Sequence, residues 1–194
     1  MDFEGVRGRS RAEPGGRAPA PGALRLVQLF VNTVDYEGPE LIGDPQALRA
    51  WLAAHDLGDH RVTPGDHARA IALREAIRSL ATTHGGGRED PAAAEIVSEA
   101  GRRARLRPVV SAETVRLEPE TGGVDGALGR IVAAIHAAIV EGTWTRLKTC
   151  DRSTCRWAFY DRSKNQSSHW CSPAVCGQRE KSRRAYRRRR SRAL

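Results

Sequence analysis

Several features that mark common protein classes are scarce or missing in this sequence. Aromatic residues make up 5% of the chain, so a core has to rely on Leu, Ile, Val and Ala, which suggests helices. The first apolar run, residues 24–34, is interrupted by Arg25, Gln28 and Asn32. It is too short and too polar for a signal sequence or a membrane span. We therefore expect a cytoplasmic protein with no membrane partner.

Sequence signatures of enzymes are also missing. There is no Gly-rich phosphate loop, no nucleophile elbow and no cluster of His with carboxylates, and the six histidines are scattered. We expect a protein that is not an enzyme.

Positive charge is concentrated near the C-terminus. Residues 1–141 contain 17 Lys and Arg against 20 Asp and Glu, whereas residues 142–194 contain 15 against 3. Such an asymmetry indicates a polyanionic partner, most often nucleic acid, for that end of the chain. The composition also divides the chain into three parts: a disordered segment over 1–22, a helical domain over 23–141 and a cysteine-containing domain over 142–194.

Local signals predict a mainly α-helical central domain. Segment 24–36 reads as a helix or a strand, and residues 109–117 as a strand of a small hairpin. Helix starts are marked by an N-cap residue followed by Pro at Asp44, Thr63 and Asp90, and Thr63 with Asp66 resembles a capping box. A nearly all-apolar helix over 126–141 is expected at the centre of the core.

The four cysteines form two symmetric pairs with the spacing C-x4-C-x15-C-x4-C. They are Cys150, Cys155, Cys171 and Cys176. Paired cysteines separated by a loop are the usual ligand set of one structural zinc ion, and a segment with so few large apolar residues needs such a metal to fold. Disulfides, four unrelated buried thiols, a redox-sensitive zinc site and an iron–sulfur cluster are the alternatives. His169 could replace one ligand, but beside Cys171 we expect it to face solvent or a phosphate.

A basic helix is predicted directly after the second cysteine pair. Ser172 is a good N-cap and Pro173 suits the first helical position, so the metal would fix the start of a cationic helix. No apolar stripe is present, which favours binding to a polyanion over packing on the domain. The alternative is a solvated tail that binds polyanions without a defined target. The candidate nucleic-acid contacts are Gln178, Arg179, Lys181, Arg183, Arg184, Arg187, Arg188 and Arg190.

The C-terminal part resembles the CGNR zinc-finger family, in a segment of about residues 142–190. The family tetrapeptide reads Cys176-Gly177-Gln178-Arg179 here, with Gln in place of Asn, and "FYDRSKN" at residues 159–165 also matches. Upstream, "LVQLFVNTVD" at residues 26–35 resembles the start of the helical ABATE domain that accompanies this finger. The resemblance implies a bacterial transcription regulator whose treble-clef-like finger, with four cysteine ligands, binds DNA.

Asn32 belongs to the family's Asn-Thr motif. It either caps the end of the first element or lines a small-molecule pocket together with Arg74 or Arg78. The simpler reading of both arginines is a surface ion pair, for instance with Glu75.

Four hypotheses on the function of the protein stay open at this stage. The leading one is a regulator that binds double-stranded DNA on the nucleoid, with a homodimer as one way to reach two half-sites. The second is a docking module for RNA polymerase or another protein, with a tail that binds polyanions nonspecifically. RNA binding is the third, although the tail holds Tyr186 alone as a stacking residue. A redox-sensitive zinc switch is the fourth.

Overall fold

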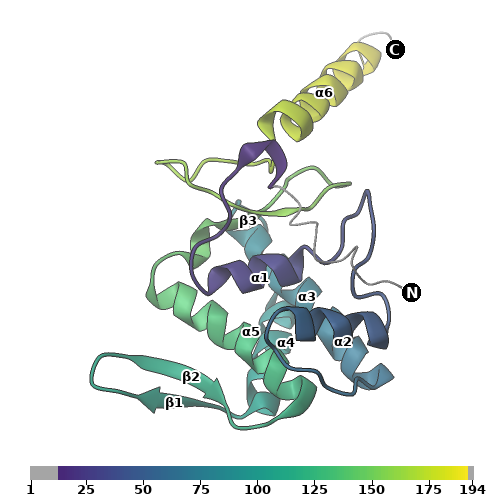
Figure 1. Ribbon diagram of the computed structural model, residues 1–194. Coiled ribbons are helices and arrows are strands. Elements are labelled where there is room, and N and C mark those ends of the chain that lie inside the picture. The colour runs from purple at the N-terminus through teal and green to yellow at the C-terminus, as the bar shows by residue number, and fades with distance from the viewer. Residues whose placement is uncertain (1–12, 192–194) are drawn as a thin grey trace.

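The computed structural model describes residues 13–191 and shows a mainly α-helical protein (Figure 1). The helices of the main body are α1 (Leu24–Val31), α2 (Pro45–Ala54), α3 (Pro64–Thr83), α4 (Pro91–Ala104) and α5 (Gly123–Val140). An antiparallel hairpin of β1 (Leu106–Val110) and β2 (Val115–Pro119) joins α4 to α5. The predicted fold class, a mainly helical domain with a small hairpin followed by a cysteine-rich finger, is confirmed.

The helix starts are fixed by the capping residues that the sequence indicates. The side chains of Asp44 and Asp90 accept hydrogen bonds from the backbone N–H groups three residues on, 2.8 and 3.2 Å away. Thr63 and Asp66 form the predicted capping box at the start of α3. The ambiguous segment 24–36 contains a helix, α1, and no strand longer than the single bridge between Val34 and Glu40.

Helix α5 lies at the centre of the core. Its residues Leu128, Ile131 and Ile135 are buried among side chains of α1, α2 and α3. A Cβ on Gly129 would lie 2.2 Å from the Cβ of Ala104, so the glycine is required for the close crossing of α4 over α5. By length and composition this helix could span a membrane, but half of it is buried inside the protein, as expected for a core helix.

The C-terminal finger packs on the same core. Its hairpin pairs β3 (Leu147–Thr149) with β4 (Ala158–Tyr160), and Leu147, Ala158 and Tyr160 join the core cluster of the helical body. A short π-helical turn, η4 (Pro173–Gly177), then leads into α6 (Gln178–Ser191), which projects from the body (Figure 1).

The segment before α1 differs from the expectation of disorder over residues 1–22. Residues 13–22 contain a 3-10 turn, η2 (Pro14–Gly16), and pack on the finger. Arg17 donates hydrogen bonds to the carbonyl oxygens of Trp170 and Cys171, both at 2.8 Å, and its guanidinium lies 4.4 Å from the ring centroid of Phe159. These contacts order a stretch whose composition alone indicates a free chain. Residues 1–12 lie outside the described part.

Candidate metal centre and nucleic-acid interface

The first cysteine pair lies in the loop of the β3–β4 hairpin. The backbone N–H of Cys150 donates to Trp157 O at 2.9 Å, which continues the ladder of the hairpin past Thr149. The chain then turns tightly, with Cys155 N–H bonded to Arg152 O at 2.8 Å and Arg156 at a φ of 50°. This knuckle brings both sulfurs to the same side of the hairpin.

The second pair is placed by the turn before α6. Ser172 caps it as predicted, because its Oγ accepts from Val175 N–H at 3.3 Å and its carbonyl accepts from Cys176 N–H at 2.8 Å. Gly177 N–H bonds to the same carbonyl at 3.1 Å, which makes the turn wider than an α-helix. Cys171 therefore precedes the turn and Cys176 lies within it.

The four sulfurs fit a tetrahedral zinc ion. All four Sγ atoms of Cys150, Cys155, Cys171 and Cys176 lie within 4.8 Å of one another, with 3.6 Å between Cys155 and Cys171 and 3.7 Å between Cys171 and Cys176. A tetrahedron with Zn–S bonds of about 2.3 Å has S–S edges of about 3.8 Å. Three of the cysteines are buried and Cys155 is partly buried. The predicted set of four cysteines is therefore placed to bind one metal ion.

The thiol cluster is held together by its own hydrogen bonds. Bonds from the Cys155 and Cys171 thiols lower the pKa of Cys150 to about 2, and the same contacts raise the pKa of Cys155 to about 12 and also raise the pKa of Cys171. Metal binding requires the thiols to lose their protons, and the four sulfurs already face one point.

His169 is outside the metal cluster. Its Nδ1 lies 2.9 Å from Asp151 Oδ2 and both side chains are about half exposed. Among the described residues the metal-binding group contains the four cysteines and no histidine, so the alternative in which His169 replaces a ligand is not what the structure shows.

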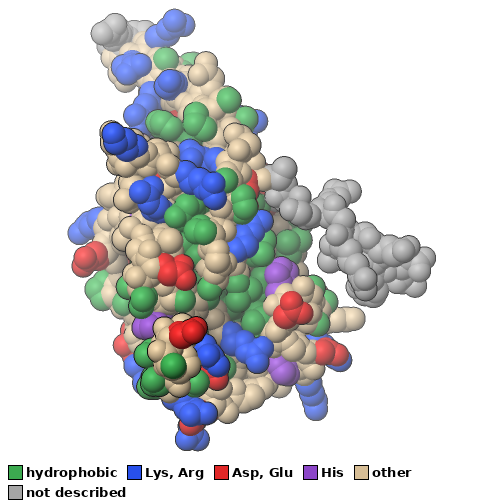
Figure 2. All heavy atoms as spheres, turned by 60° about the vertical axis from the view of Figure 1, so that its left-hand side comes forward, with side chains coloured by type: hydrophobic (Ala, Val, Ile, Leu, Met, Phe, Trp, Pro, Cys, Tyr) green, Lys and Arg blue, Asp and Glu red, His purple; other side chains and the backbone are tan. Residues whose placement is uncertain are grey.

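Helix α6 presents exposed cationic side chains along its length. It contains eight Lys and Arg and one Glu, and none of its residues is buried. Figure 2 shows Lys and Arg side chains along this helix at the top of the molecule. Glu180 forms ion pairs with Arg184 at 3.4 Å and Arg183 at 3.9 Å, and Arg179 reaches Glu37 of the helical domain at 3.5 Å. Gln178 is exposed at the start of the helix.

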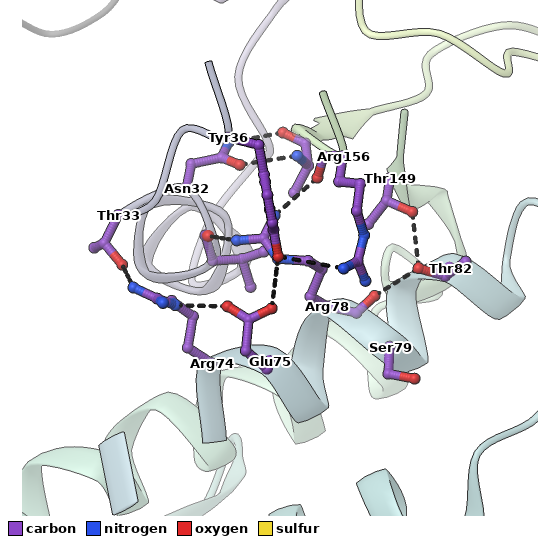
Figure 3. Close-up of polar contacts among 12 residues, drawn as sticks. Asn32, Thr33, Tyr36, Arg74, Glu75, Arg78, Ser79, Thr82, Thr149 and Arg156 are labelled. Atoms are coloured by element: carbon purple, nitrogen blue, oxygen red, sulfur yellow. Dashed lines mark hydrogen bonds and ion pairs between the residues drawn. The ribbon is translucent and has the colours of Figure 1, made fainter. Parts of the chain in front are cut away.

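Asn32, Arg74 and Arg78, the residues of the candidate small-molecule pocket, lie where the helical body meets the finger and bond to protein groups there (Figure 3). Asn32 Nδ2 donates to Ala158 O and its Oδ1 accepts from Ala158 N–H, both at 2.8 Å. Asn32 stands at the C-cap position of α1, as one of the two expectations had it, and its backbone N–H donates to Gln28 O at 3.0 Å. Its side chain bonds to the edge of β4. Both polar atoms of this side chain are therefore bonded to the finger.

Both arginines are buried, although the sequence favours a surface position for them. The fully buried Arg78 donates to Val31 O and, at 2.8 Å, to Arg156 O, and lies 3.2 Å from Glu75. Arg74 donates to Thr33 Oγ1 at 3.1 Å and also pairs with Glu75. The predicted ion pairs with Glu75 are present, but they lie in the interface between α1, α3 and the finger rather than on the surface.

A second buried ion pair supports the finger from within. Lys148 Nζ lies 3.1 Å from Asp161 Oδ2, and Asp161 also accepts hydrogen bonds from the backbone N–H groups of Ser163 and Ser168. Burial raises the pKa of this carboxyl, but the bonds from Ser163 and Ser168 outweigh it and lower the pKa. Asp161 is the Asp of the "FYDRSKN" match, and an Asp followed by Ser at the second position is the signal that could have indicated this turn.

Arg152 is a site residue that the sequence reasoning missed. It lies in the knuckle, and hydrogen bonds to Glu37 and then to the Cys176 sulfur raise its pKa. The reciprocal bond lowers the pKa of Glu37. An Arg two residues after the first cysteine is the available signal, but nothing local indicates its partner on the helical domain.

Comparison with known protein families gives two matches that together cover most of the chain. Residues 24–142 match the ABATE family, described as "Putative stress-induced transcription regulator", and residues 146–190 match the CGNR zinc finger. No curated protein matches the chain significantly.

Proposed function

Because the chain belongs to the ABATE family and ends in a CGNR zinc finger, we propose that it binds double-stranded DNA through α6, which one structural zinc ion holds in place. The observation that carries the proposal is the start of α6. The helix begins two residues after Cys176, exposes all eight of its cationic side chains and has no buried residue.

Helix α6 needs a partner of opposite charge. Arg179, Arg183 and Arg187 are spaced four residues apart, so their like charges lie next to one another on one face and oppose helix formation. Packing does not compensate, because no apolar face is present. DNA phosphates neutralise such a row, and bidentate guanidinium contacts suit both phosphate and guanine.

Zinc has a structural role in this proposal. When four sulfurs bind one zinc ion, its tetrahedral coordination is complete and no position remains for a substrate, so we assign no catalytic activity to the site. The cysteines also join the small cluster of Trp157, Phe159 and Trp170, which holds few apolar side chains. Loss of the metal therefore releases the base of α6. In the cell we expect the protein in the cytoplasm, on the nucleoid.

The test combines zinc stoichiometry with titration of a labelled DNA duplex at two salt concentrations, before and after chelation. We expect one zinc per chain and weaker DNA binding after its removal. Unchanged affinity after chelation would contradict the proposal, because α6 would then act as a plain polycation. Equal, weak binding to every duplex would favour a docking module for RNA polymerase or another protein.

Charge-neutralising variants localise the binding to α6. The double variant Arg183→Gln/Arg187→Gln is expected to reduce the slope of log affinity against log salt by about 1.8, corresponding to two lost phosphate contacts. The matched control Arg105→Gln/Arg107→Gln removes the same charge from exposed side chains at the β1–β2 hairpin. Equal losses in the two variants would argue against a defined surface on α6.

A further inference from the structure

A short loop of the helical domain lies against the metal-binding knuckle of the finger. The loop, residues 35–39, is closed at its base by hydrogen bonds from Leu41 N–H to Thr33 O at 2.7 Å and from Gly38 N–H to Asp35 O at 2.8 Å. It therefore presents its tip, Tyr36 and Glu37, in a defined position.

Tyr36 fixes the loop on the finger side. The Arg78 guanidinium lies 5.2 Å and that of Arg156 5.3 Å from the centroid of its ring, and its hydroxyl lies 3.0 Å from Glu75 Oε2 (Figure 3). Cation–π contacts of this kind favour one placement of the ring. The next residue, Glu37, is thereby directed at the knuckle.

The carboxylate of Glu37 is shared by two arginines of the finger. Arg152 donates to it twice, from Nη1 to Oε2 at 2.9 Å and from Nη2 to Oε1 at 2.6 Å. Arg179 Nη1 lies 3.5 Å from the same Oε2. One arginine belongs to the knuckle and the other to the first turn of α6, so Glu37 links both to the helical domain.

Two guanidinium groups that converge on one carboxylate have the arrangement that binds a phosphate oxygen. Arg179 is also the first member of the row that continues through Arg183 and Arg187 along α6. We propose that Arg152 and Arg179 form a binding site for a DNA backbone phosphate, and that Glu37 occupies this site as an internal competitor until DNA displaces it. This inference rests on the proposed DNA-binding function.

The exposure of the three side chains is consistent with ion pairs that DNA can break by displacing Glu37. Glu37 is 43% and Arg179 57% exposed, whereas Arg152 is 16% exposed. Ion pairs at such positions are weak and screened by salt. Arg152 is the most buried of the three side chains, so it is the part of the site that we expect to stay in place when Glu37 is displaced.

The direct test measures DNA affinity of the zinc-loaded full chain with Glu37→Gln, at about 50 and 200 mM salt, a range over which phosphate contacts change affinity strongly. The variant removes the competing charge, and we expect binding about threefold to tenfold tighter at the lower salt. Glu113→Gln is the matched control, because it removes the same charge from an exposed position at the β1–β2 turn, far from α6 (Figure 1). It should change affinity by less than about twofold, as expected for a distant screened charge.

A second pair of variants ties the gain to Arg152. Arg152→Gln should reduce the salt slope by about 0.9, one phosphate contact, and the gain from Glu37→Gln should vanish in the double variant Glu37→Gln/Arg152→Gln. Zinc content and melting temperature identify any variant that loses its fold. The inference is wrong if wild type binds DNA but Glu37→Gln matches Glu113→Gln, or if its gain persists without Arg152. If neither wild type nor Glu37→Gln binds DNA, the proposed function itself fails, and the inference fails with it.

Discussion

Replacing Asn32 with Ala tests the seam between the helical body and the finger. Asn32 is 8% exposed, and its side chain satisfies both the N–H and the carbonyl of Ala158, which lie on the outer edge of β4. In Asn32→Ala these two buried backbone groups lose that partner.

The expected cost follows from those two groups. A buried backbone donor or acceptor without a partner costs about 1–3 kcal/mol. Gln28 Nε2 lies 3.3 Å from Ala158 O and keeps part of one interaction. We therefore expect a loss of about 2–4 kcal/mol in the free energy of unfolding. For a chain of this size that corresponds to a fall of about 5–12 °C in melting temperature.

The assay is thermal and urea unfolding of the zinc-loaded protein, followed by circular dichroism and tryptophan fluorescence. Asn165→Ala is the matched control, since Asn165 is the other asparagine of the chain and is exposed. It should change stability by less than about 0.5 kcal/mol, as surface substitutions usually do. The reasoning is refuted if Asn32→Ala stays within that same range while zinc content is unchanged.

Two further predictions concern the residues at the two ends of α3, His84 at its C-terminus and Thr63 at its N-terminus. Burial lowers the pKa of His84, which bonds Leu147 O at 2.7 Å, so the stability that depends on its neutral form is complete above about pH 6.5 and declines as the pH falls below that value. Unfolding free energies at about pH 7 and 5.5 should therefore differ less in His84→Gln than in wild type, and an unchanged difference would contradict this. Thr63→Ala removes half of the capping box and should cost about 0.5–2 kcal/mol in urea unfolding; the reasoning fails if the midpoint does not move.

The parts of the fold that sequence predicts well are those fixed by neighbouring residues. An N-cap and the following Pro act over three or four residues, so Asp44, Thr63 and Asp90 mark helix starts without any knowledge of the rest of the chain. The same holds for the cysteine pairs and for the Ser172 cap, because ligand spacing and turn chemistry are local.

Contacts between distant segments could not be predicted in this way. Arg74 and Arg78 look like surface cations because arginine is rarely buried, and their burial depends on carbonyl and carboxylate partners that tertiary packing supplies. Arg17 is similar, since its hydrogen-bond partners lie more than 150 residues away along the chain. The sequence around Arg152 suggests an ordinary surface residue, and only the structure shows that the loop with Glu37 lies beside it.

Helix α6 is attached to the body through the short turn that contains Cys176, so a small change in the angle at this turn moves the whole helix. The helix has 14 residues and is therefore about 21 Å long. A tilt of about 10° at the turn moves the far end by about 4 Å on that length, more than the length of a hydrogen bond. The rigidity of this turn thus matters most for the most distant arginines. A substitution near Ser172 or Gly177 that changes the tilt should displace Arg190 further than Arg179.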